Sequence, residues 1–133
     1  MSKIIAALSA FLAVLAIGTA GAQAGHPVKG SWSGYWGPND AQKHRILMVL
    51  DWKNNEIVGT FNPGPNAVPV EKAALAVDTW TLTLEAHMPT AGGGTERYVT
   101  TGKLENLGSW HNRRYSGTYE FGKERGTFIV ALN

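Results

Sequence analysis

The 133-residue chain contains no cysteine. This absence excludes disulfide bridges, thiol redox chemistry and cysteine-ligated zinc, so packing alone must stabilise the folded protein. The chain also lacks a large excess of charge of either sign, because twelve Lys and Arg residues are balanced by ten Asp and Glu residues, which leaves a net charge of +2. So small an excess gives no general attraction to nucleic acid or acidic lipid. We therefore expect no nucleic-acid partner and no membrane partner of the mature form.

The first 24 residues have the pattern of an export signal. A positive charge precedes a largely apolar stretch over residues 4–17, and Ala22-Gln23-Ala24 is a small-residue cleavage site. A retained membrane anchor is the alternative, but the apolar stretch is short for a span and lacks a charged stop-transfer flank. We expect residues 1–24 to be a cleaved signal peptide and residues 25–133 to be one exported domain, periplasmic or secreted.

The rest of the chain lacks sustained helical periodicity, whereas short alternating runs are frequent. The clearest run is Asp78 to His87, in which apolar residues alternate with threonines, and it predicts a strand with Trp80 in the core. Roughly seven to nine short strands, spaced by turn residues, indicate an all-β fold. We predict an antiparallel up-and-down barrel or, alternatively, a sandwich.

Individual segments carry finer predictions. Gly37 to Asp40 and Thr101-Gly102 are expected to be turns, and Lys53 to Asn55 should close a tight hairpin. His44 to Trp52 is apolar at most positions, which predicts a strand covered on both faces or placed at an interface. Residues 68–76 fit either a short strand or a helical turn.

A short pattern recurs, consisting of Gly, then Ser or Thr, then an aromatic residue. In a strand the glycine and the aromatic side chain share a face, which lets a sheet coil tightly while the ring fills space. We therefore expect this pattern to bend the strands around a small barrel. The copies begin at Gly30, Gly59, Gly108, Gly117 and Gly126.

The opening Gly30-Ser31-Trp32, the successive hairpins and a last strand at the C-terminus resemble the calycin group of secreted barrels, over about residues 30 to 132. That group includes avidin-like and lipocalin-like proteins, and the resemblance implies a barrel. Avidin-like members hold their ligand with a polar residue soon after the first Trp and an Asp near the end. Here Ser33-Gly34-Tyr35 does not reproduce that pattern and no Asp follows Asp78, so biotin binding is not implied. The Asn-Pro-Gly-Pro-Asn loop at residues 62–66 is similar to one in uncharacterised exported bacterial domains.

Aromatic and arginine side chains near predicted turns are the candidates for a ligand site. Ring faces offer large contact areas at small entropic cost, and adjacent guanidinium groups suit anions or carbohydrates. We expect Trp52, Trp110 and Tyr115 to form a rim at one barrel end, although core packing would also explain such rings. The candidate ligand-binding residues are Tyr35, Trp36, Trp52, Trp110, Arg113, Arg114 and Tyr115.

Catalytic and metal-binding motifs are missing from the sequence. No nucleophile elbow, phosphate-binding loop or dinucleotide fingerprint occurs in the predicted domain, and the histidines form no H-x-H or H-E-x-x-H pair. Glu85 and His87 would share one strand face, but two groups are too few for a metal site. We expect no catalytic residue, no metal and no cofactor.

These observations favour an exported, non-enzymatic binding or interaction domain that holds a small hydrophobic or carbohydrate ligand at an aromatic-lined barrel end. The alternative is a small periplasmic inhibitor or accessory subunit that docks through loops 62–66 and 92–94, because a proline-restricted loop loses little entropy on binding. The partner is accordingly a small molecule or a protein. An enzyme is the third hypothesis, and a buried Glu85–His87 pair would support it.

Overall fold

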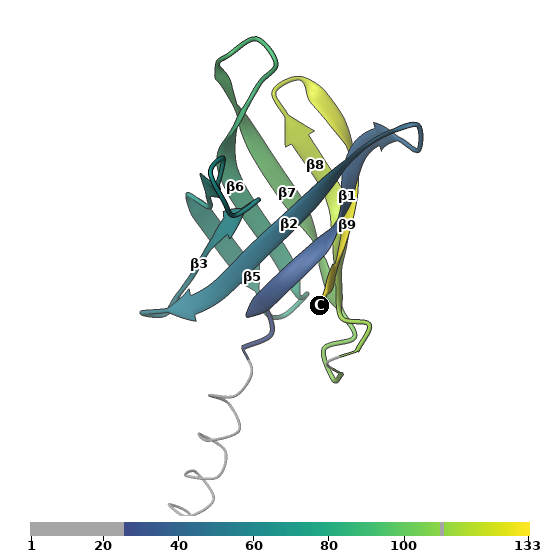
Figure 1. Cartoon of the computed structure of the whole chain (residues 1–133). Coiled ribbons are helices and arrows are strands. Elements are labelled where there is room, and N and C mark those ends of the chain that lie inside the picture. The colour runs from purple at the N-terminus through teal and green to yellow at the C-terminus, as the bar shows by residue number, and fades with distance from the viewer. Residues whose placement is uncertain (1–25, 110) are drawn as a thin grey trace, which may run out of the picture.

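A computed structural model describes residues 26–109 and 111–133 (Figure 1), so the predicted signal peptide and Trp110 lie outside the described residues. The described residues form strands and turns, with no helix. Within them, nothing has the helical length and apolar character that a membrane crossing requires. The strands are β1 (Gly30–Asn39), β2 (Gln42–Lys53), β3 (Glu56–Phe61), β4 (Val68–Pro69), β5 (Lys72–Ala76), β6 (Thr81–Pro89), β7 (Thr95–Glu105), β8 (Arg114–Phe121) and β9 (Glu124–Leu132).

The nine strands make one antiparallel sheet in the order β4-β3-β2-β1-β9-β8-β7-β6-β5. Each strand pairs with its neighbour in sequence, except β4 with β5, and the last strand pairs with the first. This arrangement confirms the all-β antiparallel class and the predicted number of strands. The predicted closed barrel is not formed, because the sheet remains open between β4 and β5.

The opening has a local cause at the crossing between β4 and β5. β4 contains only two residues, one of which is Pro69, and proline has no N–H to donate. The next two residues bond to opposite sides of the gap, since Val70 N donates to Gly59 O on β3 (2.9 Å) and Glu71 N donates to Glu85 O on β6 (2.8 Å). The chain therefore crosses between the two edges, and residues 68–76 form strands instead of a helical turn.

Inward-facing side chains fill the space inside the curled sheet. Leu82, Leu84 and Ala86 on β6 are fully buried, which confirms the alternation predicted for that strand. Trp80 differs from the prediction, because it lies in the turn before β6 with a φ of 54° and is only half-buried. Five large aromatic side chains, each no more than 1 % exposed, occupy the centre: Trp32, Phe61, Tyr98, Tyr115 and Tyr119.

Gly102 and Gly117 show how glycine shapes the sheet, and Gly117 begins one copy of the recurring pattern. The turn predicted at Thr101-Gly102 is wrong, because β7 runs through both residues without interruption. Gly102 pairs with Gly117 across β7 and β8, and a Cβ at either position would collide with the backbone of the other strand. The ring of Phe128, which is the cross-strand partner of Gly117, lies against Gly102. Glycine therefore permits the tight curl while a ring covers it.

Two further predictions for β1 and β2 need correction. Asn39 belongs to β1, and the hairpin turn is confined to Asp40 and Ala41, because the Asn39 side chain accepts bonds from the Ala41 and Gln42 amides (both 3.0 Å). β2 is buried on one face only, since Val49 is 38 % exposed between buried Met48 and Leu50. Its apolar outward residues therefore do not indicate a strand covered on both faces.

The tight hairpin predicted at Lys53 to Asn55 is confirmed. Asn54 and Asn55 form the two-residue turn between β2 and β3, with φ values of 52° and 63°. Positive φ at both central residues matches the right-handed twist of the strands on either side.

The two ends of the sheet are organised differently (Figure 1). At the end where residue 26 enters, here called the N-terminal end, Trp32 Nε1 donates to Val28 O (2.8 Å) and Val28 is fully buried. Arg113 donates to Pro27 O (3.2 Å) and Leu107 O (2.9 Å). The lead-in segment therefore plugs this end. The opposite end, here called the hairpin end, carries the β1–β2, β6–β7 and β8–β9 connections.

Candidate functional site

The residues predicted to bind a ligand do not gather in one place. Trp52 lies at the N-terminal end, 41 % exposed, with its ring stacked on His26 at 4.3 Å between centroids. Tyr115 is in the core, where its hydroxyl bonds to Thr100 (2.8 Å) and donates to Leu82 O (2.9 Å). These two rings therefore do not make the expected exposed rim, and Trp110 lies outside the described residues.

The two arginines also have separate roles. Arg113 is buried at 6 % exposure and holds the plug at the N-terminal end, whereas Arg114 is exposed at the start of β8. Adjacent residues in a strand point to opposite faces, so the pair does not present two guanidinium groups to one ligand. Tyr35 and Trp36 are the predicted site residues that lie at the hairpin end.

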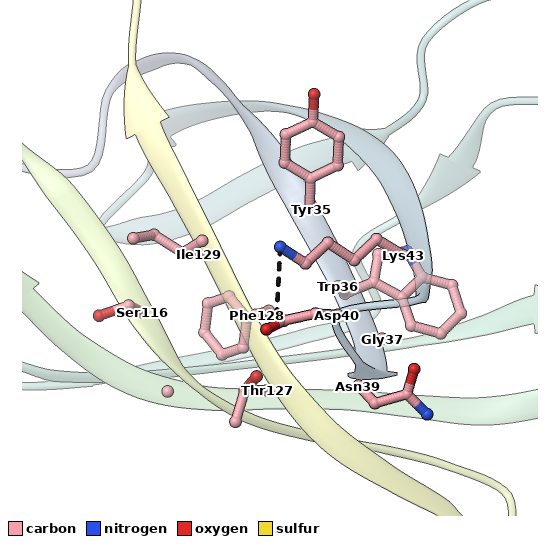
Figure 2. Close-up of a pocket in the computed structure, with 11 residues that line it drawn as sticks. Tyr35, Trp36, Gly37, Asn39, Asp40, Lys43, Ser116, Thr127, Phe128 and Ile129 are labelled. Carbon is pink, nitrogen blue, oxygen red and sulfur yellow. Dashed lines mark ion pairs between the residues drawn. The ribbon is translucent and has the colours of Figure 1, made fainter.

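Tyr35 borders a hollow of about 480 Å³ on the outer face of the sheet (Figure 2). Its cross-strand partner Ile129 is the second apolar wall, and both side chains are nearly half exposed (44 % and 45 %). Ser116 and Thr127 add hydroxyl groups from β8 and β9. We call this feature the Tyr35 hollow, defined by Tyr35, Asp40, Lys43, Ser116, Thr127 and Ile129.

A β-bulge in the first hairpin places the charged rim of the Tyr35 hollow. Trp36 pairs with His44 and Asn39 pairs with Gln42, so Gly37 and Pro38 oppose the single residue Lys43. Bulges re-aim side chains and accept proline, which donates no ladder bond. Lys43 reaches the hollow from β2, and its Nζ lies 3.4 Å from an Asp40 carboxylate oxygen (Figure 2).

A second cation accompanies Tyr35. Arg45, the cross-strand partner of Tyr35 on β2, places its Cζ 6.0 Å from the centroid of the tyrosine ring. Over residues 26–109 and 111–133, Arg45 has no carboxylate within ion-pair distance. The Tyr35 hollow thus combines an exposed ring, an apolar wall, hydroxyl groups and a lysine beside one carboxylate, while Arg45 lies over the tyrosine ring, outside the lining of the hollow.

A neighbouring hollow of about 610 Å³, here called the loop hollow, opens between the loops of the hairpin end. Asn62 and Asn66 from the proline loop line it together with Thr90 and Ala91 from the β6–β7 loop. The second loop is closed by its own bonds, with Thr90 N donating to Gly94 O (2.8 Å). Asn62 and Asn66 of the first predicted docking loop thus line the hollow, whereas residues 92–94 of the second do not, although Thr90 and Ala91 of the same β6–β7 loop do.

The floor of the loop hollow is aromatic and closed. Trp36 lines it and stands edge-on to Tyr98 (5.2 Å), Tyr119 (4.9 Å) and Phe121 (5.7 Å). His44 lies against the same indole at 4.4 Å. Beneath this layer burial raises the pKa of the Tyr98 hydroxyl, which has no hydrogen-bond partner among the described residues. A ligand at this end would therefore rest on the rings and not inside the sheet.

Glu85 and His87 do not pair with each other. Glu85 accepts from Arg97 Nη2 (2.6 Å) and Nε (3.0 Å), and this interaction holds the pKa of its carboxyl below the ordinary value. His87 Nδ1 instead lies 2.7 Å from Glu71 Oε2, with about half of its side chain exposed. The geometry proposed as support for an enzyme is therefore not present at these two residues.

The histidines and acidic residues of the described part of the chain lie too far apart to form a metal site. In the part of the chain that the structure describes, no three of the residues His, Asp and Glu lie close enough to hold a metal ion. His26 stacks on Trp52, and its partial burial lowers the pKa of the imidazole. His44 packs on Trp36, so the two rings are accounted for by aromatic contacts.

The comparisons with known proteins identify no relative, because no family model, no curated protein and no solved structure matches this chain. The site must therefore be interpreted from its own residues.

Three residues beside Tyr35 were not predicted from the sequence as site residues. Ile129, Lys43 and Arg45 join Tyr35 through strand pairing, and Ile129 comes from the last strand while Tyr35 comes from the first. The alternation of residues 30–36 by itself places Tyr35 on the strand face opposite Trp32 and Trp36. The pairing of the first strand with the last was the missing information.

Proposed function

We propose that this chain is an exported, non-enzymatic binding domain that takes a small ring-bearing ligand, hydrophobic or carbohydrate, in the Tyr35 hollow. The observation that carries the proposal is the exposed Tyr35–Ile129 pair beside hydroxyl groups in a concave surface of about 480 Å³. Ligand sites combine apolar walls with a few placed polar groups, and this hollow has both.

The filled interior supports a surface site in preference to a buried one. Trp32, Tyr98 and Tyr115 each expose none of their surface and occupy the centre of the sheet. An aromatic side chain offers a ligand a large, rigid contact area at low entropic cost, and Tyr35 presents such a ring to solvent. The proposed ligand thus contacts the outer face of the hairpin end, close to the half-buried Trp36.

A second candidate function is a periplasmic inhibitor or accessory subunit that docks through its loops. Its support is the convergence of the Asn62–Asn66 loop and the β6–β7 loop on the loop hollow. Pro63 and Pro65 restrict the first loop, so little conformational entropy is lost when a protein partner orders it.

Native mass spectrometry of the exported protein tests the proposal. The full chain is expressed and the exported form is isolated gently, as wild type, as Tyr35→Ala and as Trp52→Ala. Tyr35 and Trp52 make a matched pair because they are similarly exposed, 44 % and 41 %, at opposite ends. We expect a retained small-molecule mass in the wild type and in Trp52→Ala, and its loss in Tyr35→Ala.

Other outcomes of that experiment contradict the proposal in different ways. A bare protein with a co-isolated protein partner favours the accessory-subunit function. A small molecule that is lost only in Trp52→Ala would move the site to the N-terminal end. A mass that still includes residues 1–24 would contradict cleavage of the signal peptide.

A further inference from the structure

We infer that the ligand of the Tyr35 hollow is an acidic saccharide, a sugar ring that carries a carboxylate. This inference rests on the proposed binding function and names its ligand class. It follows from the two cations beside Tyr35 and from the stacking surface and the polar rim of the hollow.

Two cations beside Tyr35 favour an anion: Lys43 lines the hollow, and Arg45 lies next to it and lines the loop hollow. Arg45 lies 6.0 Å from the Tyr35 ring centroid and, in the described part of the chain, no carboxylate lies within 4.0 Å of it. A guanidinium group suits two parallel hydrogen bonds to a carboxylate. Among the described residues, Lys43 forms an ion pair only with Asp40, whose side chain is completely exposed, so water and a ligand carboxylate both compete well for that lysine.

The stacking surface favours a ring. Tyr35 lies between Arg45 on β2 and Ile129 on β9, its two cross-strand neighbours. The apolar face of a sugar ring can lie on the tyrosine ring and against Ile129, which removes apolar surface of both partners from water. This geometry leaves the ring substituents pointing toward the rim.

The polar rim favours a sugar over an aromatic acid. Ser116 and Thr127 present hydroxyl groups, and Asp40 presents a carboxylate that accepts hydrogen bonds from ring hydroxyls. The Ser116 hydroxyl makes only a long bond, 3.4 Å to Glu105, so it can exchange that bond for a ligand. An aromatic acid would satisfy the cations and the stacking surface but would leave these groups without a new partner.

The test is a nuclear magnetic resonance titration with two matched probes, methyl β-D-glucuronide and methyl β-D-glucoside, which differ only by the carboxylate. We expect the wild-type protein to bind the glucuronide about tenfold more tightly, because one charged hydrogen-bonded pair is added. The amide signals that move should be those of Tyr35, Thr127 and Ile129. Added salt should reduce the preference for the glucuronide and leave glucoside binding unchanged.

Variants separate the contributions. Arg45→Gln should reduce the glucuronide preference to near unity without weakening glucoside binding, and Lys43→Gln should reduce it by a smaller factor. Tyr35→Ala should lose both probes. Trp52→Ala, at the other end, should bind both probes as the wild type does. Arg45 and Lys43 are exposed, so these variants are expected to fold.

Each alternative result overturns a defined part of the inference. Equal binding of the two sugars at Tyr35 would reject an acidic ligand and leave the proposed binding function standing. Benzoate that binds as tightly as the glucuronide would reject a saccharide. If no probe moves the Tyr35, Thr127 and Ile129 signals, the inference fails, while the native mass measurement independently decides whether the hollow holds another ligand.

Discussion

The hairpin end and the N-terminal end of the sheet are built from the same kinds of side chain but use them in opposite ways. At the N-terminal end, Trp32 is fully buried and hydrogen-bonded to the lead-in segment. At the hairpin end, Trp36 on the same strand and the same face is only half-buried, and the loops around it leave two hollows. Trp32 therefore stabilises the fold at one end of the strand, whereas Trp36 borders accessible surface at the other.

Arginine shows the same contrast. Arg113 donates to the carbonyls of Pro27 and Leu107 at the N-terminal end, so its guanidinium group joins the lead-in segment to the β7–β8 connection. Arg45 at the hairpin end instead lies over the ring of Tyr35, and its side chain makes no hydrogen bond or ion pair within the described residues. A guanidinium group whose donors are used by carbonyls serves the fold, whereas one with unused donors is available to a ligand.

The largest expected effect is on Trp32. Replacing Trp32 by Ala removes a completely buried indole and the bond to Val28 O, so we expect the free energy of unfolding to fall by about 3–5 kcal/mol. Tyr35→Ala, on the exposed face of the same strand, should change it by less than about 0.5 kcal/mol. Chemical denaturation followed by circular dichroism measures both. Similar losses in the two variants would contradict the division between the ends.

The second effect concerns the plug itself. Arg113→Met keeps much of the side-chain length but leaves the Pro27 and Leu107 carbonyls without these donors, which should destabilise the protein by roughly 1–3 kcal/mol. Arg114→Met is the matched control, because the neighbouring arginine is exposed and should be nearly neutral. Equal midpoints of urea unfolding in the two variants would mean that the plug contributes little.

These contrasts also explain which features the sequence could predict. Alternation correctly placed Leu82, Leu84 and Ala86 in the core, because burial on one face of a strand imposes a period of two. Gly102 was taken for a turn because a glycine that admits a neighbouring strand and a glycine that bends the chain look alike without the partner strand. Arg113 was taken for a ligand residue for a similar reason, since its partners are distant carbonyls.

The candidate site was predictable only in part. Tyr35 was placed on the outer face by local alternation, and its exposure confirms that position. Ile129 and Arg45 could not be assigned to it, since register between strands is set by the whole sheet and not by nearby residues. The open seam between β4 and β5 was also unpredicted, because it depends on Val70 and Glu71 bonding to different strands.

A smaller difference in stability is expected between phenylalanine variants of two buried tyrosines. Tyr115→Phe removes bonds to Thr100 and Leu82 O and should cost about 1 kcal/mol of unfolding free energy. Tyr98→Phe removes a hydroxyl group that has no partner among the described residues, so stability should stay the same or rise. Thermal unfolding of the two variants compares them directly. A loss in Tyr98→Phe as large as that in Tyr115→Phe would show that the Tyr98 hydroxyl is satisfied in solution.

The smallest expected effect is a pH dependence confined to the crossing between β4 and β5. The Arg97 bond lowers the pKa of Glu85 in the folded protein, so the folded state binds fewer protons in acid than the unfolded state. This contribution to stability is complete above the ordinary glutamate pKa and is lost as the pH falls through the lower, folded value. Lys72 Nζ on β5 also lies 3.8 Å from a carboxylate oxygen of Glu85. Protonation of Glu85 therefore weakens the ion pair between β6 and the edge strand β5.

Hydrogen exchange at decreasing pH, corrected for the intrinsic rates, measures this effect. Amides of β5 and of Glu71, which donates to Glu85 O, should lose protection before the Val28–Trp32 region does. Glu85→Gln should remove most of the difference in protection between the crossing and the Val28–Trp32 region, while Glu56→Gln should retain it, because Glu56 has no ion-pair partner in the described part of the chain. If the crossing and the Val28–Trp32 region lose protection together in the wild type, Glu85 does not hold the crossing, and the seam between β4 and β5 is as stable in acid as the plugged end.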